Sequence, residues 1–298
     1  MSWFVLSLLS ALFLGFYDIA KKAAVRENAV PPVLLCNVLT AALLWGPMAA
    51  GAWLFPTEVA DWQRALVELD LQGHLLLAAK SLLVGMSWTL ALFAIKRLPI
   101  SIATPIRATS PLWTVTFAVV AMHERPTANQ WCGMLLILIA FIAFSRVGKR
   151  EGIHFRSDRG VLLMVLATLL GAASALYDKY LLQQVGLPPA VVQAWFSFYL
   201  VPVMLPLSVH WWLRERRQHP FQWRWSIPMI AVFLLIADFS YFTAVADTEA
   251  LISVISPLRR TSILVPFLFG ILHLGEKNWK GKLACICGIL LGVVWLSQ

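Results

Sequence analysis

Three arginines lie inside long apolar stretches of this chain, where a guanidinium is an unusual residue. Arg107 lies near the middle of one stretch, and the adjacent Arg259 and Arg260 lie near the middle of another. A guanidinium in hydrocarbon is costly and is rarely retained without an acidic partner, a cavity or a bound anion. Because its planar donors pair with carboxylate and phosphate groups in bidentate fashion, these arginines predict either an anion site or ion pairs between helices.

The two stretches around the arginines are copies of one pattern, an apolar run with an arginine and a proline near its middle. With Pro105 aligned on Pro257, three further pairs coincide: Arg107 with Arg259, Thr109 with Thr261, and Ser110 with Ser262. A doubled, proline-interrupted apolar segment is the pattern expected around the binding site of a membrane transporter. We therefore predict that Thr109 and Ser110 join the arginines in a substrate site.

The composition places these stretches in a membrane. Hydrophobic residues make up 60% of the chain and charged residues 13%, whereas ordinary globular chains carry about 25% charged residues. Apolar runs of membrane-spanning length cover residues 2–23, 31–54, 75–95, 98–122, 128–147, 160–182, 188–213, 226–246, 249–273 and 278–297. The sequence therefore predicts an all-α polytopic membrane protein with ten transmembrane helices.

The basic residues lie in the short loops between these runs, so the net charge of +9 indicates membrane topology rather than a nucleic-acid partner. Loops after odd-numbered runs hold seventeen lysines and arginines, and loops after even-numbered runs hold three. Because positively charged loops stay in the cytoplasm, we expect both chain termini on the non-cytoplasmic side. The expected location is the inner (plasma) membrane, as a multi-pass protein.

A charged cytoplasmic linker is expected at residues 148–159, where it divides the runs into two groups of five. With an odd number of spans in each half, the second half must enter the membrane upside down relative to the first. The sequence thus predicts two inverted five-helix repeats, residues 1–147 and residues 160–298.

Loop charges and short sequence similarities between the two halves agree with this inversion. The loop after the third run contains Lys96-Arg97, whereas the corresponding loop of the second half contains Asp247 and Glu249, as an inverted repeat requires. Further echoes are Tyr17-Asp18 with Tyr177-Asp178 and Pro31-Pro32 with Pro188-Pro189.

A set of short motifs recurs in the two halves. The first half contains Ala94-Ile-Lys-Arg-Leu-Pro99, Ser110-Pro111, Glu124 and Trp131-Cys-Gly133, and the second contains Ala244, Pro257, Gly275-Glu276 and Gly281. On these residues the chain resembles the drug/metabolite transporter superfamily, in its ten-helix EamA-type branch. It departs from the family where Ser110 precedes Pro111 in place of the usual Glu-Pro. The resemblance implies a secondary transporter, usually an exporter of small metabolites, with a central cavity between the halves.

The charges inside the apolar runs converge on one depth. Arg107 lies about nine residues into its run, or about 13 Å, which is near the midplane of a ~30 Å core. Arg259 and Arg260 reach the same depth from the opposite surface, and Asp238 is also mid-depth. Since neighbouring positions on a helix point about 100° apart, we expect one of these two arginines to face the cavity and the other an acidic residue or a neighbouring helix. Asp238 is a candidate for a coupling proton.

Two interpretations of these charges stay open. In the first, Arg107 with Arg259 or Arg260 holds the carboxylate or phosphate of a substrate, and Trp88 and Tyr241 stack on a substrate ring. In the second, arginines and aspartates only neutralise each other and hold helices together. The second interpretation is favoured for Asp18 and Asp178, which lie nearer the ends of their runs; for the arginines both remain.

The motifs separate several classes of function. An intramembrane enzyme is disfavoured, because the chain contains no His-Glu-x-x-His, no Gly-x-Ser-x-Gly and no paired carboxylates at matching depth. A secondary transporter, most simply an exporter of a small anionic or zwitterionic metabolite by alternating access, fits best. A flippase for a lipid-linked phosphate or sugar would use the same arginines and is the alternative.

Cofactors and partners follow from the same inspection. The chain contains no nucleotide-binding loop, and its four cysteines lack the spacing of a metal site, so we expect neither a cofactor nor a metal. The expected partners are a small-molecule substrate and the lipid bilayer. Ten helices in two halves can enclose a site alone, so a monomer suffices and a homodimer is the alternative.

Overall fold

The computed structural model describes residues 2–55, 58–97, 106–107, 110–121, 123, 125–147, 158–265, 268–269 and 279–296. Regular structure in these ranges is helical throughout, and six of the described helices are long and apolar enough to cross a membrane. The prediction of an all-α, polytopic membrane protein is therefore confirmed. The number of ten transmembrane helices and the inverted relation of the halves stay predictions.

The described part of the first half consists mainly of helices. Its described helices are α1 (Trp3–Val25), α2 (Val30–Leu54), α3 (Asp61–Arg64), α4 (Leu71–Arg97), α6 (Ser110–Ala121) and α7 (Ala128–Val147). The Pro31-Pro32 pair lies in the first turn of α2, where the missing N–H groups have no intrahelical partner to lose. Both prolines therefore mark the start of a helix rather than a kink.

The described part of the second half also consists mainly of helices. Its described helical segments are α8 (Arg159–Lys179), the π-helical turn η1 (Tyr180–Gln184), α9 (Pro189–His210), the π-helical turn η2 (Trp211–Glu215), α10 (Ser226–Ala246), α11 (Ile252–Arg260), the 3-10 turn η3 (Thr261–Ile263) and α13 (Trp279–Leu296). Helix α8 begins where it does because the Asp158 carboxylate accepts hydrogen bonds from the backbone N–H of Gly160 at 2.6 Å and of Val161 at 3.2 Å. The predicted linker thus ends on a helix cap.

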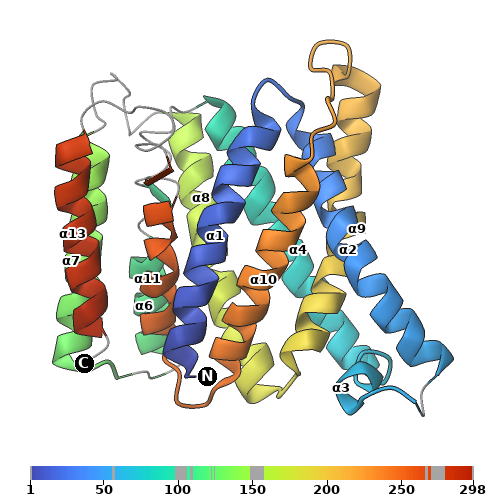
Figure 1. Ribbon diagram of the computed structural model, residues 1–298, viewed down its shortest axis with the longest axis horizontal. Coiled ribbons are helices and arrows are strands. Elements are labelled where there is room, and N and C mark those ends of the chain that lie inside the picture. The colour runs from blue at the N-terminus through green and yellow to red at the C-terminus, as the bar shows by residue number, and fades with distance from the viewer. Residues whose placement is uncertain are drawn as a thin grey trace.

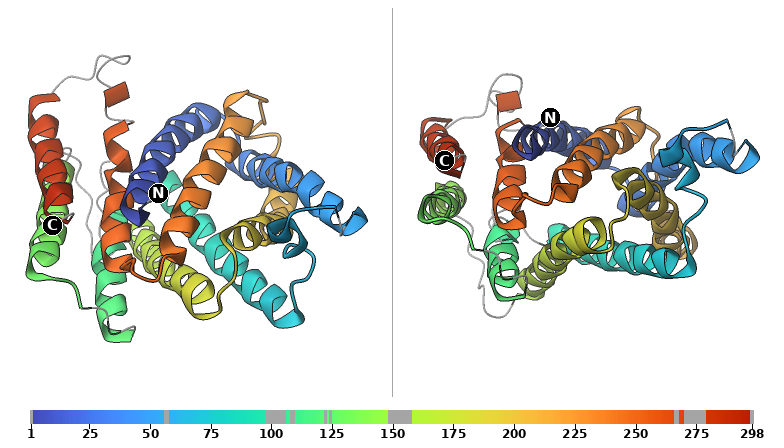
Figure 2. Two further views of the ribbon diagram at one scale, coloured as in Figure 1. Left: turned by 60° about the horizontal axis from the view of Figure 1, so that its bottom comes forward. Right: turned by 90° about the horizontal axis from the view of Figure 1, so that it is seen from below.

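The strongest helix contacts join the two halves of the chain (Figures 1 and 2). Helix α1 packs along α10 and α4 packs along α8, while α2 lies against α9 at one edge and α7 against α13 at the other. Helices α6 and α11 contact each other between these groups. The start of α1 and the end of α13 lie at the same end of the bundle (Figure 1).

The most extensive apolar cluster among the described residues lies at the end of the bundle near both termini. Leu66, which follows α3, is 1% exposed and belongs to this cluster with Phe242. Backbone groups are tied in as well, because Trp195 Nε1 donates to the Leu66 carbonyl at 2.8 Å and Gln183 Nε2 donates to the Asp247 carbonyl at 2.6 Å. Buried apolar surface and these hydrogen bonds together stabilise the packing at this end of the bundle.

Helices α7 and α13 approach each other closely through glycine. A Cβ atom at Gly292 of α13 would lie 2.6 Å from Ile137 Cγ1 and 2.9 Å from the Gly133 carbonyl oxygen of α7. Apolar helices in a bilayer gain little from burying more hydrocarbon, so they associate where small residues let their backbones meet. The absence of a side chain at Gly292 therefore allows α13 to pack closely against α7.

We expect Gly292→Ala to lower the apparent unfolding temperature of the purified protein, because the added methyl group meets a backbone carbonyl that has little room to move; overpacking of this kind costs about 1–3 kcal/mol. Gly46→Ala is the matched control, since a Cβ atom at Gly46 of α2 meets nothing within 4 Å, and alanine is the better helix former. Equal thermal stability of the two variants would contradict the close packing of α7 on α13.

Candidate functional site

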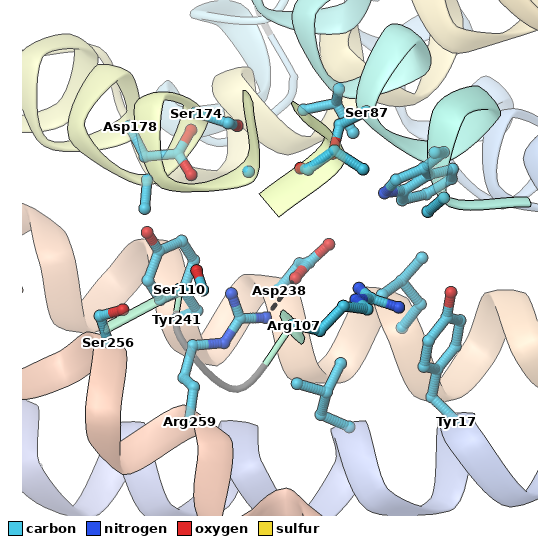
Figure 3. A pocket seen from close by; sticks show the side chains of 18 of the residues that line it. Tyr17, Ser87, Arg107, Ser110, Ser174, Asp178, Asp238, Tyr241, Ser256 and Arg259 are labelled. Carbon is cyan, nitrogen blue, oxygen red and sulfur yellow. Dashed lines mark hydrogen bonds and ion pairs between the residues drawn. The ribbon is translucent and has the colours of Figure 1, made fainter. Parts of the chain in front are cut away.

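A cavity of about 200 Å³ lies inside the bundle. Its lining residues come from α1, α2, α4, Arg107 and α6 of the first half and from α8, α9, α10 and α11 of the second. Side chains of α8, such as Ser174 and Asp178, face Tyr241 and Arg259 from α10 and α11 across the cavity (Figure 3). Both halves of the chain therefore build one site.

Most of the residues predicted from the sequence line this cavity. They are Trp88, Arg107, Ser110, Asp238, Tyr241, Arg259 and Arg260. The predicted site residue Thr109 lies outside the described residues, as do Glu124 and Glu276 of the recurring motifs. The structure thus brings together side chains that come from three separate regions of the sequence.

Arg259 is fully engaged with neighbouring groups. Its Nη2 lies 2.7 Å from Asp238 Oδ1 of α10, and its Nε donates to Ser10 Oγ of α1 at 3.1 Å. Its guanidinium lies 4.0 Å from the centre of the Tyr241 ring, within the range of a cation–π contact. Charge neutralisation and helix contacts therefore account for this arginine without a ligand.

Arg260 points to a different neighbour, as expected for the next position on a helix. Its Nη2 donates to Ser110 Oγ of α6 at 3.0 Å, while its buried Nε has no hydrogen-bond partner. Helix α11 ends at Arg260, so both arginines occupy its last turn, where the helix dipole favours a positive charge.

Arg107 is the least restrained of the three arginines. Its side chain is exposed to the cavity and makes no hydrogen bond or ion pair with a described residue. Asp18 of α1 lies within electrostatic range of Arg107, Arg260 and Lys21. No carboxylate of the described residues forms an ion pair with Arg107 or with Arg260. Arg107 and Arg260 therefore retain donors that a ligand can use.

A buried ion pair that sequence reasoning did not connect lies in the cavity wall. Lys80 of α4 pairs with Asp178 of α8, and these residues are only 1% and 5% exposed. The Lys80 ammonium also lies 4.6 Å and 4.9 Å from the ring centres of Phe196 and Phe242. A lone lysine in an apolar run was the available signal, but nothing in the sequence pairs two residues so far apart.

The cavity has further polar lining that the sequence did not single out. These residues are Tyr17, Lys21, Ser87, Thr168, Ser174 and Ser256. Ser87 Oγ donates to the Ala167 carbonyl at 2.7 Å, and Ser256 Oγ donates to Thr114 Oγ1 at 3.3 Å. Serine and threonine are common inside apolar helices because their hydroxyls bond to the helix backbone, so their presence alone carried little signal.

The described lining carries more positive than negative charge. Five basic side chains, those of Lys21, Lys80, Arg107, Arg259 and Arg260, face two carboxylates, those of Asp178 and Asp238. The two carboxylates are taken up by the ion pairs with Lys80 and Arg259. The remaining cations, Lys21, Arg107 and Arg260, all lie within electrostatic range of Asp18 of α1. Counting that carboxylate, two positive charges are in excess around the cavity, and an excess of this sign favours anions.

Comparisons with known proteins bear on the family and the fold of the chain. The model of the EamA-like transporter family matches residues 1–146 and 158–298. A relative from Archaeoglobus fulgidus, described as an uncharacterized transporter, is 24% identical over 295 residues, covering 98% of this chain and 96% of the relative. A solved structure described as "Crystal structure of protein" has a TM-score of 0.71 at 15% identity, covers 99% of this chain and 96% of its own, and supports the fold.

Proposed function

Because the chain belongs to the EamA-like transporter family, we propose that it is a secondary transporter that exports a small anionic or zwitterionic metabolite by alternating access. The resemblance drawn from the sequence is confirmed, and members of this family are transporters rather than enzymes. The proposed substrate charge rests on the excess of positive charge around the cavity, where five basic side chains meet three carboxylates, those of Asp178, Asp238 and Asp18. An anion between the basic side chains would replace the missing counter-charges.

The proposal includes two inverted repeats, residues 1–147 and 160–298, that together span the membrane ten times. Reciprocal helix contacts support it: the pairing of α1 with α10 has its counterpart in the pairing of α8 with α4, as two-fold symmetry requires. The pairs α2 with α9, α6 with α11, and α7 with α13 each join equivalent helices. The cavity would then lie at the pseudo-two-fold axis, where inverted-repeat transporters bind their substrates.

We further propose that both termini lie on the non-cytoplasmic side of an inner (plasma) membrane. Helix α1 ends near Arg26, and the turn between α9 and α10 contains Arg216 and Arg217, at the end of the bundle away from the termini (Figure 1). Positive loops favour the cytoplasm. In this orientation the end of the bundle that holds the apolar cluster around Leu66 and Phe242 faces the non-cytoplasmic side.

The site residues have distinct roles in this proposal. Arg107 and Arg260, with Ser110 and the adjacent Thr109, would hold the anionic group of the substrate. Trp88 and Tyr241, which line the cavity, would contact its apolar part. Asp238 is the proposed site of a coupling proton, since protonation would weaken its ion pair with Arg259 and free that guanidinium for the substrate.

A ligand screen tests the substrate class. Small carboxylates, phosphates, amino acids, cations and neutral sugars would be added separately to the detergent-purified protein, and unfolding temperature would be measured. Ligands that bind the folded state raise it by mass action, so we expect a rise with anions or zwitterions. Flux of the best ligand into proteoliposomes then checks transport. Stabilisation by cations alone would contradict the proposal, and stabilisation confined to lipid-linked phosphates would favour a flippase.

A further inference from the structure

A small chamber adjoins the cavity between α2, α9 and α10. It measures about 20 Å³, and its walls include Asn37 of α2 and Gln193 of α9. It shares four wall residues with the main cavity, namely Trp88, Phe196, Leu234 and Asp238. A cavity needs roughly 10–15 Å³ to hold a water molecule, so the chamber accommodates one water-sized group next to the proposed substrate.

Asn37 is the feature of this chamber that lacks an explanation. The residue is 2% exposed, its Oδ1 is buried, and its side chain makes no hydrogen bond with a described residue. Nearly all buried polar side-chain groups in folded proteins have a partner. Gln193, on the facing helix, does have one, because its Nε2 donates to the Leu235 carbonyl at 2.6 Å. The Asn37 amide therefore calls for a polar group inside the chamber.

Asp238 supplies the second polar group. Its Oδ1 pairs with Arg259 at 2.7 Å, and no described residue donates a hydrogen bond to its Oδ2. An ionised carboxylate only accepts hydrogen bonds, whereas an amide offers a donor and an acceptor. The chamber thus presents one amide NH₂ group and two acceptor oxygens, Asn37 Oδ1 and Asp238 Oδ2, that make no hydrogen bond with a described residue.

We infer that this chamber binds a hydroxyl group of the transported anion, so that the substrate is a hydroxylated carboxylate or phosphate. A hydroxyl donates one hydrogen bond and accepts others, which suits both Asp238 and Asn37. An ammonium group only donates, so it cannot accept the hydrogen bond that the NH₂ group of Asn37 in the chamber wall offers. The inference rests on the proposed function and specifies its substrate class; the other possible occupant is an ordered water.

Matched ligands separate these occupants. Glycerol 3-phosphate would be compared with n-propyl phosphate, and lactate with propionate and with alanine, by their effect on the unfolding temperature and by competition for uptake. A site that hydrogen-bonds a substrate hydroxyl rejects the analogue without it strongly. We expect at least about tenfold tighter binding of the hydroxylated member of each pair, with alanine weaker than lactate.

Asn37→Leu tests the assignment of the residue. The preference ratio between hydroxylated and deoxy ligands should fall towards one, while the folded state is retained, because this substitution removes an amide that makes no hydrogen bond with a described residue. Thr40→Val is the control: Thr40 lies one turn further along α2, its Oγ1 donates to the Cys36 carbonyl at 2.8 Å, and it lines neither the chamber nor the cavity. Its variant should keep the wild-type ratio.

The outcomes distinguish the inference from the proposed function. If hydroxylated and deoxy anions bind equally well, or the ratio survives in Asn37→Leu, the chamber holds only an ordered water and the inference is overturned while the anion site stands. If none of these ligands binds, the proposed function itself is wrong, and the inference that rests on it is wrong as well. A hydroxyl preference that disappears in Asn37→Leu and persists in Thr40→Val supports the inference.

Discussion

Replacing Lys80 by methionine is expected to lower the unfolding temperature more than any other single change in the cavity wall. The substitution removes the cation that Asp178 pairs with and leaves a carboxylate that is only 5% exposed. Removing one partner of a buried ion pair costs about 3–5 kcal/mol, because the remaining charge is uncompensated. Methionine keeps the length of the side chain and its contact with Phe196 and Phe242, so the loss reports on charge rather than on packing.

A double variant makes this prediction specific. Lys80→Met combined with Asp178→Leu removes both charges, and replacement of a buried ion pair by apolar residues of similar size is often neutral or stabilising. We expect the double variant to recover most of the stability lost in Lys80→Met. Lys21→Met is the control, because Lys21 is only half-buried and has no comparable ion pair in the described chain. A double variant less stable than Lys80→Met would show that the pair is not the relevant interaction.

Substitution of Arg107 or Arg260 by glutamine is expected to abolish stabilisation by anions while leaving the protein folded. Neither side chain forms an ion pair with a described residue, so little structure depends on its charge. Losing a charged hydrogen-bond partner of a ligand costs about 2–5 kcal/mol, which corresponds to a loss of affinity of roughly 30-fold or more.

The matched control is Arg216→Gln. Arg216 is an exposed guanidinium that stacks on Trp212 at 4.6 Å, outside the cavity, so its loss should not change ligand binding. Titration of the unfolding temperature with the best anion, followed by flux into proteoliposomes, measures all three variants. If Arg107→Gln and Arg260→Gln bind anions like the control variant, the excess cations serve another purpose and the proposed site is wrong.

The membrane fold followed from the sequence alone. Runs such as 160–182 and 226–246 are apolar enough and long enough to cross a bilayer, and a backbone in hydrocarbon must satisfy its polar groups within a helix. Helices α8 and α10 therefore lie where the sequence expects them. The sequence also predicted that a helix begins after the charged linker. The exact first residue could not be predicted, because it depends on the single capping side chain of Asp158.

The importance of the arginines was likewise visible in the sequence. A guanidinium in an apolar run is costly wherever the helices pack, so Arg107, Arg259 and Arg260 stood out without any structure. The sequence did not show, however, which group each arginine contacts. Arg259 meets Asp238 and Ser10, whereas Arg260 meets Ser110, because these partners come from helices whose relative rotation no local pattern specifies.

Only the tertiary structure decided the rest of the site. Lys80 and Asp178 lie 98 positions apart in the chain and meet because α4 packs along α8. Asn37 is an ordinary asparagine in the sequence, and its unsatisfied amide becomes apparent only when α2, α9 and α10 enclose it. Hydrophobicity and the cost of charge act on single residues and can be read along a chain, whereas pairing and enclosure are properties of helix faces, which only the packed bundle defines.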